Sequence, residues 1–289
     1  KRLTMIQPIL RGQALLADIN SARPQSGEVC VWWLGQSGYA LKTASGLFYI
    51  DLYLSEHLTQ KYAATEKPHI RMTESPLHGS EINNAAWVFA SHKHSDHLDP
   101  ETLPALFAAS LDARLILPAA LAGHAMSLGL PAERLIPTRG DESFQIGSAT
   151  VHSIPSAHPD LSYDETSGYP FLGFLIEVDN LRIYHSGDTL AYDGLAARLK
   201  PFAPDILFLP INGTDARRDA LKVPPNMNAA EAVSLAQAVG SGLVIPHHYD
   251  MFTFNTADVN DFAALARNTG LTFTILQPGE RWTFRKSSA

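Results

Sequence analysis

The chain has 289 residues, and its 29 Asp and Glu outnumber its 22 Lys and Arg, so its formal net charge is −7 at pH 7. Hydrophobic residues make up 45 %, which is enough to bury a large core. The acidic balance argues against a nonspecific binder of nucleic acid or anionic membranes, because such proteins carry excess Lys and Arg on one face. The single cysteine, Cys30, excludes an internal disulfide framework and a cysteine-based zinc cluster. Any metal site must therefore use carboxylates and some of the 12 histidines.

The sequence carries no sign of a membrane or export segment. No apolar stretch approaches the roughly 18 residues that span a bilayer. Residues 1–16 have apolar positions at helical spacing, but no signal-peptide core or cleavage pattern. We therefore expect a cytoplasmic protein that acts on a small molecule and binds neither nucleic acid nor membrane. The sequence leaves the oligomeric state open, a homo-oligomer included.

The first third of the chain predicts a helix and then an antiparallel meander. Residues 1–27 are expected to form an N-terminal helix and loop, with the helix at 13–19. Three β-branched or aromatic runs follow, separated by glycine-containing turns, at 29–34, 39–43 and 47–52. Residues 55–84 are polar and weakly patterned, which indicates a long loop with little regular structure that could serve as a lid.

The rest of the chain alternates short apolar runs with helical segments. Further strands are expected at 86–90, 115–117, 206–210, 243–245 and 272–276, with hairpins at 144–154 and 171–185. Helices are expected at 101–110, 119–128, 228–239 and 256–268. Asn228 and Glu231 form a capping-box pattern, and Asp179-Asn180 is typical of a type I′ hairpin turn. This order predicts one α/β domain over 1–289, with two mixed sheets packed face to face and helices outside.

Four ligand-type side chains fall within six residues, in an H-x-H-x-D-H segment made by His92, His94, Asp96 and His97. The segment lies between a predicted buried strand and a helix, and a strand end that turns into a helix can splay alternate side chains around one point. Imidazole suits zinc, iron or manganese, and a carboxylate adds the negative charge that holds a divalent ion. A solvated polar loop is the alternative, but it does not require three histidines. The segment therefore predicts a metal site.

Additional ligands must come from other strand ends. His158 follows the strand that ends at residue 154, Asp188 follows the hairpin at 171–185, and His247 and His248 follow the strand at 243–245. Functional residues concentrate on loops held by a rigid scaffold. Each residue alone is more readily explained as a core or surface polar group, and their shared position after strands favours the metal site.

Five features follow one another along the chain: an Asp on an early strand (Asp51), the H-x-H-x-D-H segment, a later His, an Asp in S-G-D-T and a final His. This order resembles the metallo-β-lactamase superfamily over nearly the whole chain. The resemblance implies a four-layer αββα sandwich of two mixed β-sheets with helices on the outer faces, in agreement with the two-sheet prediction. Within the superfamily the chain looks most like the L-ascorbate-6-phosphate lactonases and related metal-dependent hydrolases. The similar stretches are WWLG at 32–35, YHSGD at 184–188 and VIPHHYDMF at 244–252. His158 is a departure, since those lactonases lack a clear histidine at that position.

The resemblance also implies two divalent metal ions and their ligands, with zinc or manganese expected and iron or nickel open. One ion would be bound by His92, His94 and His158, the other by Asp96, His97 and His248, and both by Asp188. Asp51 would orient the ligand loop by hydrogen bonds. His248 is preferred to His247 as the final ligand, which leaves His247 to contact the ligands without binding metal.

Two divalent ions about 3.5–4 Å apart can share a water and lower its pKa toward neutrality. The predicted nucleophile is therefore a metal-bridging hydroxide, oriented by Asp96 as a catalytic residue. His185 or His247 is the candidate for protonating the leaving group. Cys30 lies in the middle of a predicted strand and is interpreted as a small core residue.

The predicted reaction is the opening of a small ester or lactone, with a phosphorylated sugar lactone among the options. Arg217 and Arg218 could hold a phosphate or carboxylate, and Asn212 could face the metals. A phosphodiesterase of the same superfamily is one alternative, although the net charge and the lack of a basic patch weaken nucleic acid as its substrate. A non-catalytic metal-binding protein is the other, because a sequence cannot show an open coordination position. The remaining histidines match no motif and are expected to be surface or core groups: His57, His69, His78, His124 and His152.

Overall fold

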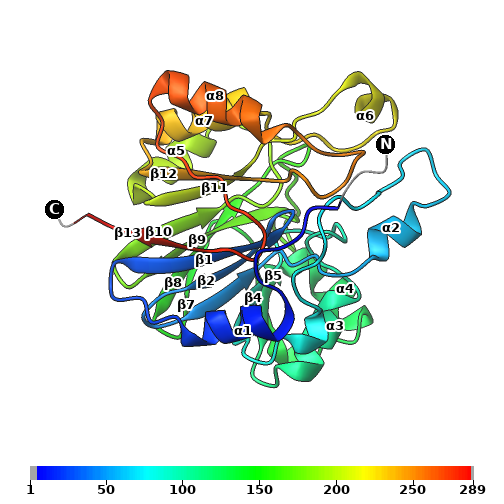
Figure 1. The fold of residues 1–289 in the computed structure, drawn as a ribbon, viewed down its shortest axis with the longest axis vertical. Helices are drawn as coiled ribbons and strands as arrows, with labels where there is room; N and C mark the ends of the chain where they lie inside the picture. The colour runs from blue at the N-terminus through cyan, green and yellow to red at the C-terminus, as the bar shows by residue number, and fades with distance from the viewer. Residues whose placement is uncertain (1–4, 288–289) are drawn as a thin grey trace.

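The computed structural model describes residues 5–287 and consists of two mixed β-sheets packed face to face, with helices on both outer sides (Figure 1). In spatial order, the first sheet contains β13 (Arg281–Arg285), β1 (Glu28–Gly35), β2 (Gly38–Lys42), β3 (Leu47–Ile50), β4 (Trp87–Phe89), β5 (Arg114–Pro118) and β6 (Leu135–Thr138). The first four strands are antiparallel neighbours, and β3 to β6 run parallel. The predicted meander at the start of the chain is therefore confirmed.

The second sheet is also mixed. In spatial order it contains β12 (Leu243–His247), β11 (Ile206–Pro210), β10 (Leu181–His185), β9 (Leu172–Val178), β8 (Ala149–Pro155) and β7 (Glu142–Ile146). Strands β10, β11 and β12 are parallel, whereas β7 to β10 are antiparallel. The turn between β9 and β10 has positive φ at Asp179 (50°) and Asn180 (65°), as the predicted type I′ turn requires.

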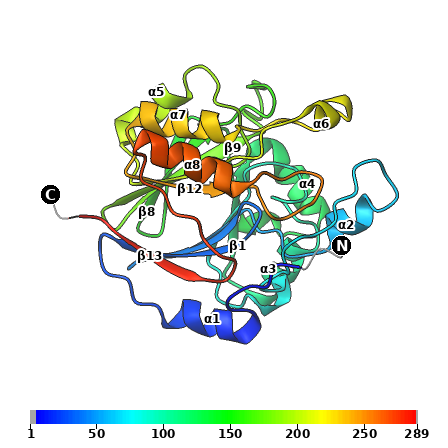
Figure 2. The ribbon, with the colours of Figure 1, turned by 45° about the horizontal axis from the view of Figure 1, so that its top comes forward.

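Helices cover the outer face of each sheet, which confirms the predicted four-layer αββα class. The first sheet packs on α1 (Gly12–Ser21), α3 (Thr102–Ala109) and α4 (Ala122–Ser127), and the second on α5 (Leu195–Leu199), α7 (Ala229–Val239) and α8 (Val259–Thr269). Figure 2 shows α7 and α8 on one side of the sandwich and α1 on the opposite side. The remaining helical segments are α2 (His57–Lys61), α6 (Ala216–Ala220), η1 (Gly79–Glu81), η2 (Ala119–Leu121), η3 (Ala132–Arg134) and η4 (Lys200–Phe202).

Side-chain alternation along β1 explains how one strand serves two cores. Val29, Val31 and Trp33 belong to the core between the sheets, because successive side chains of a strand point to opposite faces. Cys30 and Trp32 belong to the layer between the first sheet and its helices. Cys30 is a buried free thiol, in keeping with its predicted place in the core.

One sequence-based assignment was wrong. Residues 272–276 do not form the last strand, since only Phe273 makes a parallel bridge, to Val244. The last strand is β13, which pairs with β1 and forms one edge of the first sheet. The pattern of β13 is weak because its side chains are only half-buried or exposed, with arginine at both ends.

Residues 55–84 have more structure than predicted, since they contain α2 and η1. Arg71 is 7 % exposed, and its guanidinium donates to the carbonyl oxygens of Ser55 (2.7 Å) and Thr73 (3.0 Å). A buried guanidinium needs such partners, and these bonds tie the start of the segment, at Ser55, to residues 71–73. Within residues 5–287, the helices are all too short or too polar to cross a bilayer.

Candidate metal centre

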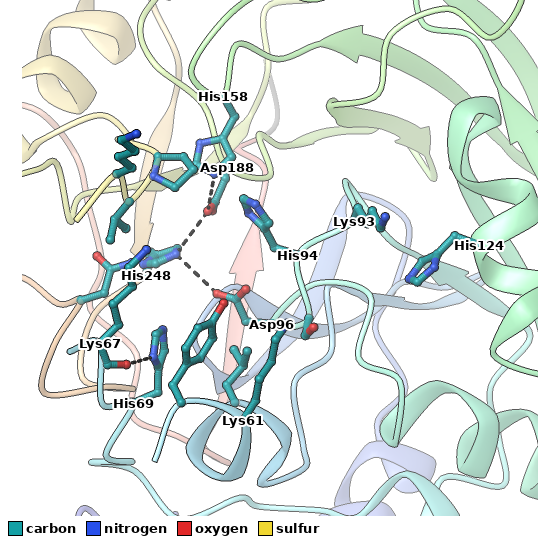
Figure 3. Close-up of a pocket in the computed structure, with 17 residues that line it drawn as sticks. Lys61, Lys67, His69, Lys93, His94, Asp96, His124, His158, Asp188 and His248 are labelled. Carbon is teal, nitrogen blue, oxygen red and sulfur yellow. Dashed lines mark hydrogen bonds and ion pairs between the residues drawn. The ribbon is translucent and has the colours of Figure 1, made fainter. Parts of the chain in front are cut away.

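Both sheets contribute loops to one rim of the sandwich. Residues 91–97 follow β4 of the first sheet, whereas His158, Asp188 and His248 follow β8, β10 and β12 of the second. Figure 3 shows His94, Asp96, His158, Asp188 and His248 pointing toward one another. The shared position after strand ends, from which the sequence predicted a metal site, thus brings these side chains together in space.

The seven side chains expected as ligands form two groups. Within each group, one ligand atom per residue lies within 4.8 Å of the others; the groups are His92, His94, His158 and Asp188, and Asp96, His97 and His248. Asp188 lies between them, since its Oδ1 is 3.3 Å from His97 Nε2 and its Oδ2 is 3.3 Å from His248 Nε2. The same Oδ2 is 3.6 Å from His158 Nε2. The Asp188 carboxylate can therefore serve both groups.

Asp51 organises the loop after β4 from beneath. Its side chain is fully buried; Oδ1 accepts from the Ser91 backbone N–H (2.7 Å), and Oδ2 accepts from Ser91 Oγ (2.6 Å). His97 Nδ1 lies 2.7 Å from Asp51 Oδ2 and must donate to it. This bond points His97 Nε2 toward the centre, and carboxylate–histidine contacts of this kind orient metal-binding imidazoles.

His158 is oriented in the same way by a backbone carbonyl. Its Nδ1 lies 3.1 Å from the Pro225 carbonyl oxygen, which can only accept, so the Nδ1 proton is held there. Nε2 is then free to act as a ligand. On the neighbouring loop, His92 Nε2 and His94 Nδ1 are 2.9 Å apart, so two ring nitrogens converge on one point.

The backbone reaches this arrangement through left-handed conformations. Asp51 (φ 48°), Gln36 (φ 50°) and His248 (φ 64°) adopt them although none is glycine. Such conformations cost about 1–3 kcal/mol each and cluster at functional sites. Gly187 (φ 58°) precedes Asp188, and a Cβ there would lie 2.5 Å from Ser91 Cβ, so only glycine permits this contact between the loops.

Burial sets the protonation of the first group. Burial lowers the pKa of His158 to about 4, and burial together with the neighbouring His97 and His94 holds the pKa of His92 well below its ordinary value. Both imidazoles are therefore neutral at pH 7, the form in which histidine binds metal. Since one ring proton of His158 is committed to Pro225, its remaining lone pair faces the centre.

Negative charge dominates the second group. Burial disfavours a charged His97, yet Asp188, Asp51 and Asp96 outweigh it and raise the pKa of His97 well above its ordinary value. Among residues 5–287, His97 Nε2 and Asp188 Oδ1 are buried without a hydrogen-bond partner. Buried polar atoms are normally satisfied. Two unsatisfied atoms facing each other within a cluster of nitrogen and oxygen donors fit bound divalent cations.

Gln36 is a member of the site that sequence reasoning did not single out. It is fully buried in the turn between β1 and β2, and its Nε2 donates to Asp96 Oδ2 (2.9 Å) and lies 3.2 Å from His248 Nε2. Its Oε1 has no partner among the described residues. The only available signal was a polar residue between two glycines, in Gly35-Gln36-Ser37-Gly38, which also fits an ordinary turn.

His185 and His247 lie behind the ligands, with their rings stacked at a centroid distance of 5.0 Å. His185 Nε2 donates to the Ser37 carbonyl oxygen (2.8 Å), and its Nδ1 accepts from the Gly187 N–H (3.1 Å). His247 Nδ1 is 3.0 Å from Ser37 Oγ. Both imidazoles are fully buried, and burial lowers the pKa of each. Neither lines the pocket beside the centre.

A pocket of about 480 Å³ opens over the two groups of ligands (Figure 3). His94, Asp96, His158, Asp188 and His248 line it, as do apolar side chains of two other segments: Leu58, Tyr62, Val223 and Pro224. His69 and His124, which matched no motif, also line it. Residues 58–69 of the expected lid segment therefore form one wall of the pocket.

The predicted substrate-binding residues do not line this pocket. Arg218 is buried, and its guanidinium donates to Asp215 Oδ2 and Asn255 Oδ1, both at 2.7 Å. The Asn212 amide donates to the same Asn255 oxygen (2.9 Å). Arg217 lies over the ring of Phe254 at 5.2 Å. These side chains hold the loop around α6 in place.

Comparisons with known proteins identify one matching family and several relatives. The family described as "Beta-lactamase superfamily domain" matches residues 62–249. A UPF0173 metal-dependent hydrolase of Methanoregula boonei is 29% identical over 198 residues, which are 67% of this chain and 80% of that relative. Another from Methanosarcina mazei is 25% identical and covers 86% of this chain and 96% of its own length. The crystal structure of isothiocyanate hydrolase from Delia radicum gut bacteria has the same fold, with a TM-score of 0.71, 18% identity, and coverage of 89% of this chain and 100% of that one.

Proposed function

Because the chain belongs to the beta-lactamase superfamily and is related to its metal-dependent hydrolases, we propose that it hydrolyses a small ester or lactone with two bound divalent ions. One observation carries the proposal: two groups of ligand side chains, most of them buried, lie on either side of Asp188 at the floor of an open pocket. The donors are nitrogen and oxygen only, which suits zinc or manganese and also admits iron or nickel.

When bound, such ions supply Lewis acidity and lower the pKa of water. The chain's own residues would position the attacking water and accept its proton. Asp96 lines the pocket, and its carboxylate is held by the Gln36 amide at 2.9 Å. We propose that Asp96 orients the attacking water and takes its proton. His94, which is exposed to the pocket, lies at the substrate side of the centre.

The contacts of His185 favour a positioning role over the predicted proton transfer to the leaving group. Both of its ring nitrogens are engaged, with Ser37 and Gly187, and it has no exposed surface. A general acid must come within hydrogen-bond reach of the atom that it protonates. His185 and His247 instead support the turn that carries Gln36 and the loop that carries Asp188.

The pocket also weighs against a non-catalytic metal-binding protein. A purely structural metal site has a closed coordination sphere, whereas His94 and Asp96 border open space here. A volume of about 480 Å³ suits a small molecule. A phosphodiesterase acting on a small diester uses the same centre, and only substrate tests separate it from a lactonase. A phosphorylated sugar lactone belongs in those tests.

Elemental analysis and a substrate screen on the metal-loaded protein test the proposal. We expect two divalent ions per chain and turnover of esters or lactones. In His94→Ala, both turnover and metal content should fall while the fold is kept. The matched control is His152→Ala, which removes an imidazole of β8 that lies outside the site. Full activity and metal content in His94→Ala, or a wild-type protein that binds no metal, would overturn the proposal. Turnover of bis(p-nitrophenyl) phosphate without any lactone would replace it by the phosphodiesterase.

A further inference from the structure

Four lysines line the pocket over the metal centre, and we call them the lysine collar: Lys61, Lys67, Lys93 and Lys222. The only carboxylates among the described lining residues are Asp96 and Asp188, both of which are candidate metal ligands. The chain as a whole carries a net charge of −7. Positive charge is therefore concentrated around the pocket that opens over the candidate metal ligands.

The collar is assembled from three separate parts of the chain. Lys61 ends α2 and Lys67 lies shortly after it, Lys93 stands inside the H-x-H-x-D-H segment, and Lys222 follows α6 with φ 53°. Figure 3 shows Lys61, Lys67 and Lys93 on different sides of the ligand cluster. No local sequence feature, such as a run of like charge on one helix, accounts for this convergence.

The ammonium groups of the collar are available to a ligand. Within residues 5–287, none of the four makes an ion pair or donates a hydrogen bond, and Lys61 Nζ lies 5.3 Å from the centroid of the Tyr62 ring. Two other lysines are engaged, since Lys42 donates to the Ile19 carbonyl oxygen (2.7 Å) and Lys286 pairs with Asp205 (3.0 Å), whereas Lys200 is exposed and makes neither kind of contact within residues 5–287.

The segments that carry the collar are held in place. The Lys67 carbonyl oxygen accepts from His69 Nδ1 (2.6 Å), and the His69 ring stacks on Tyr62 at 4.5 Å. Arg217, beside the loop of Lys222, donates to the Glu66 carbonyl oxygen (3.4 Å). This contact joins the segment of α2, which carries Lys61 and Lys67, to the segment of α6, which carries Lys222.

From these observations we infer that the substrate carries an anionic group, a phosphate or carboxylate, remote from the bond that is cleaved, and that the collar binds this group. The inference rests on the proposed hydrolytic function. Like charges that gather without counterions repel one another, and an anionic ligand removes that repulsion. Bound metal cations beneath the collar would add to this repulsion among the lysines. Lysine binds phosphate as a point charge, without the bidentate geometry of arginine.

The experiment compares δ-gluconolactone with its 6-phosphate on the metal-loaded protein, because the two differ only in an anionic group remote from the scissile bond. We expect a higher kcat/KM for the phosphorylated lactone, and this preference should shrink as salt rises from about 50 to 500 mM. In Lys67→Gln/Lys222→Gln, KM for the phosphorylated lactone should rise about tenfold with kcat little changed. KM for the neutral lactone should change much less. Lys200→Gln, an exposed lysine that does not line the pocket, is the matched control. Equal kcat/KM for both lactones in all variants would overturn the inference.

A binding measurement separates this inference from the proposed function. If neither lactone is hydrolysed, the proposal that the protein is a lactonase fails. The collar can then still be tested by calorimetric titration with glucose 6-phosphate and with glucose. Tighter binding of the phosphate, weakened about tenfold in Lys67→Gln/Lys222→Gln and not in Lys200→Gln, supports the collar. Equal binding of both sugars, or equal binding by all variants, refutes it.

Discussion

Replacement of Asp51 by Asn should weaken metal binding at the group formed by Asp96, His97 and His248 while the fold is kept. The Asp51 carboxylate has no exposed surface and accepts three hydrogen bonds, from the Ser91 backbone, from Ser91 Oγ and from His97 Nδ1. Asn offers one acceptor oxygen and one donor NH₂ in the same volume. If the NH₂ group takes the place of Oδ1, it faces the Ser91 backbone N–H; if it takes the place of Oδ2, it faces both Ser91 Oγ and His97 Nδ1.

The expected loss of metal affinity follows from this contact between two donors. If the NH₂ group faces His97 Nδ1, the imidazole must carry its proton on Nε2 instead. Nε2 is the atom that lies 3.3 Å from Asp188 Oδ1. A protonated Nε2 cannot bind metal. Loss of an outer partner of this kind costs roughly 10–100-fold in metal affinity, about 1.4–2.8 kcal/mol. Hydrolysis at a fixed low metal concentration should fall by a similar factor.

Competition with a chromophoric chelator measures the affinity, and circular dichroism checks the fold. Ser91→Ala is the matched control, because it removes one donor to Asp51 but leaves the contact between Asp51 and His97, and it should lose less affinity than Asp51→Asn. If Asp51→Asn binds two ions with wild-type affinity, the role given to the Asp51–His97 contact is refuted.

Three further predictions concern the pH dependence, the turn between β1 and β2, and one helix cap. Since the pKa of His158 is about 4 when folded and near 6.5 when unfolded, the unfolded chain takes the proton first. The free energy of unfolding of the metal-free protein should therefore fall by about 3 kcal/mol from this group as pH drops from 6.5 to 4, seen by urea titration. Gln36→Ala removes the amide donor to Asp96 and should weaken metal affinity about tenfold, measured by the same chelator competition. Asn228→Ala removes the capping box of α7 and should cost about 1 kcal/mol in thermal unfolding.

Each of these has its own control. The non-titrating variant His158→Gln should make the slope between the two pH values shallower by the contribution of His158, and an unchanged slope would contradict the assignment to His158. Gln36→Glu keeps the size of the side chain but places a carboxylate beside Asp96, so it should bind metal no better than Gln36→Ala if the donated hydrogen bond matters. Asn228→Asp retains a good cap and should leave stability nearly unchanged.

Local patterns predicted most of the strands and helices because their causes are local. The Asn228–Glu231 capping box and the Asp179-Asn180 turn each depend on a few adjacent residues, and both are present. Strand pairing is not local. Residues 272–276 are rich in β-branched and aromatic side chains but only cross the edge of β12, whereas β13, which starts and ends with arginine, completes the first sheet.

The residues of the site also differ in whether a local sequence signal marks them. Ligands that follow strand ends could be found because each carries its own signal, helped by the resemblance to a known order of residues. Gln36 and the lysine collar carry no such signal, because an isolated glutamine in a turn or a single surface lysine is common in any chain. Only the folded arrangement places Gln36 against two ligands and brings the four lysines around one pocket. Arg217 and Arg218 had the more suggestive sequence, yet their partners are Phe254, Asp215 and Asn255.

The division of the ligands between the two sheets has a consequence for how the protein matures. His92 and His97 are supplied by the first sheet, and Asp188 and His248 by the second, at positions far apart in the chain. Such long-range contacts form late in folding, because closing long loops costs entropy before any contact is gained. Neither sheet alone offers a complete set of ligands. A newly made chain would therefore complete its candidate metal site only after the sheets dock, and the rate of metal uptake during refolding would report the rate of that docking.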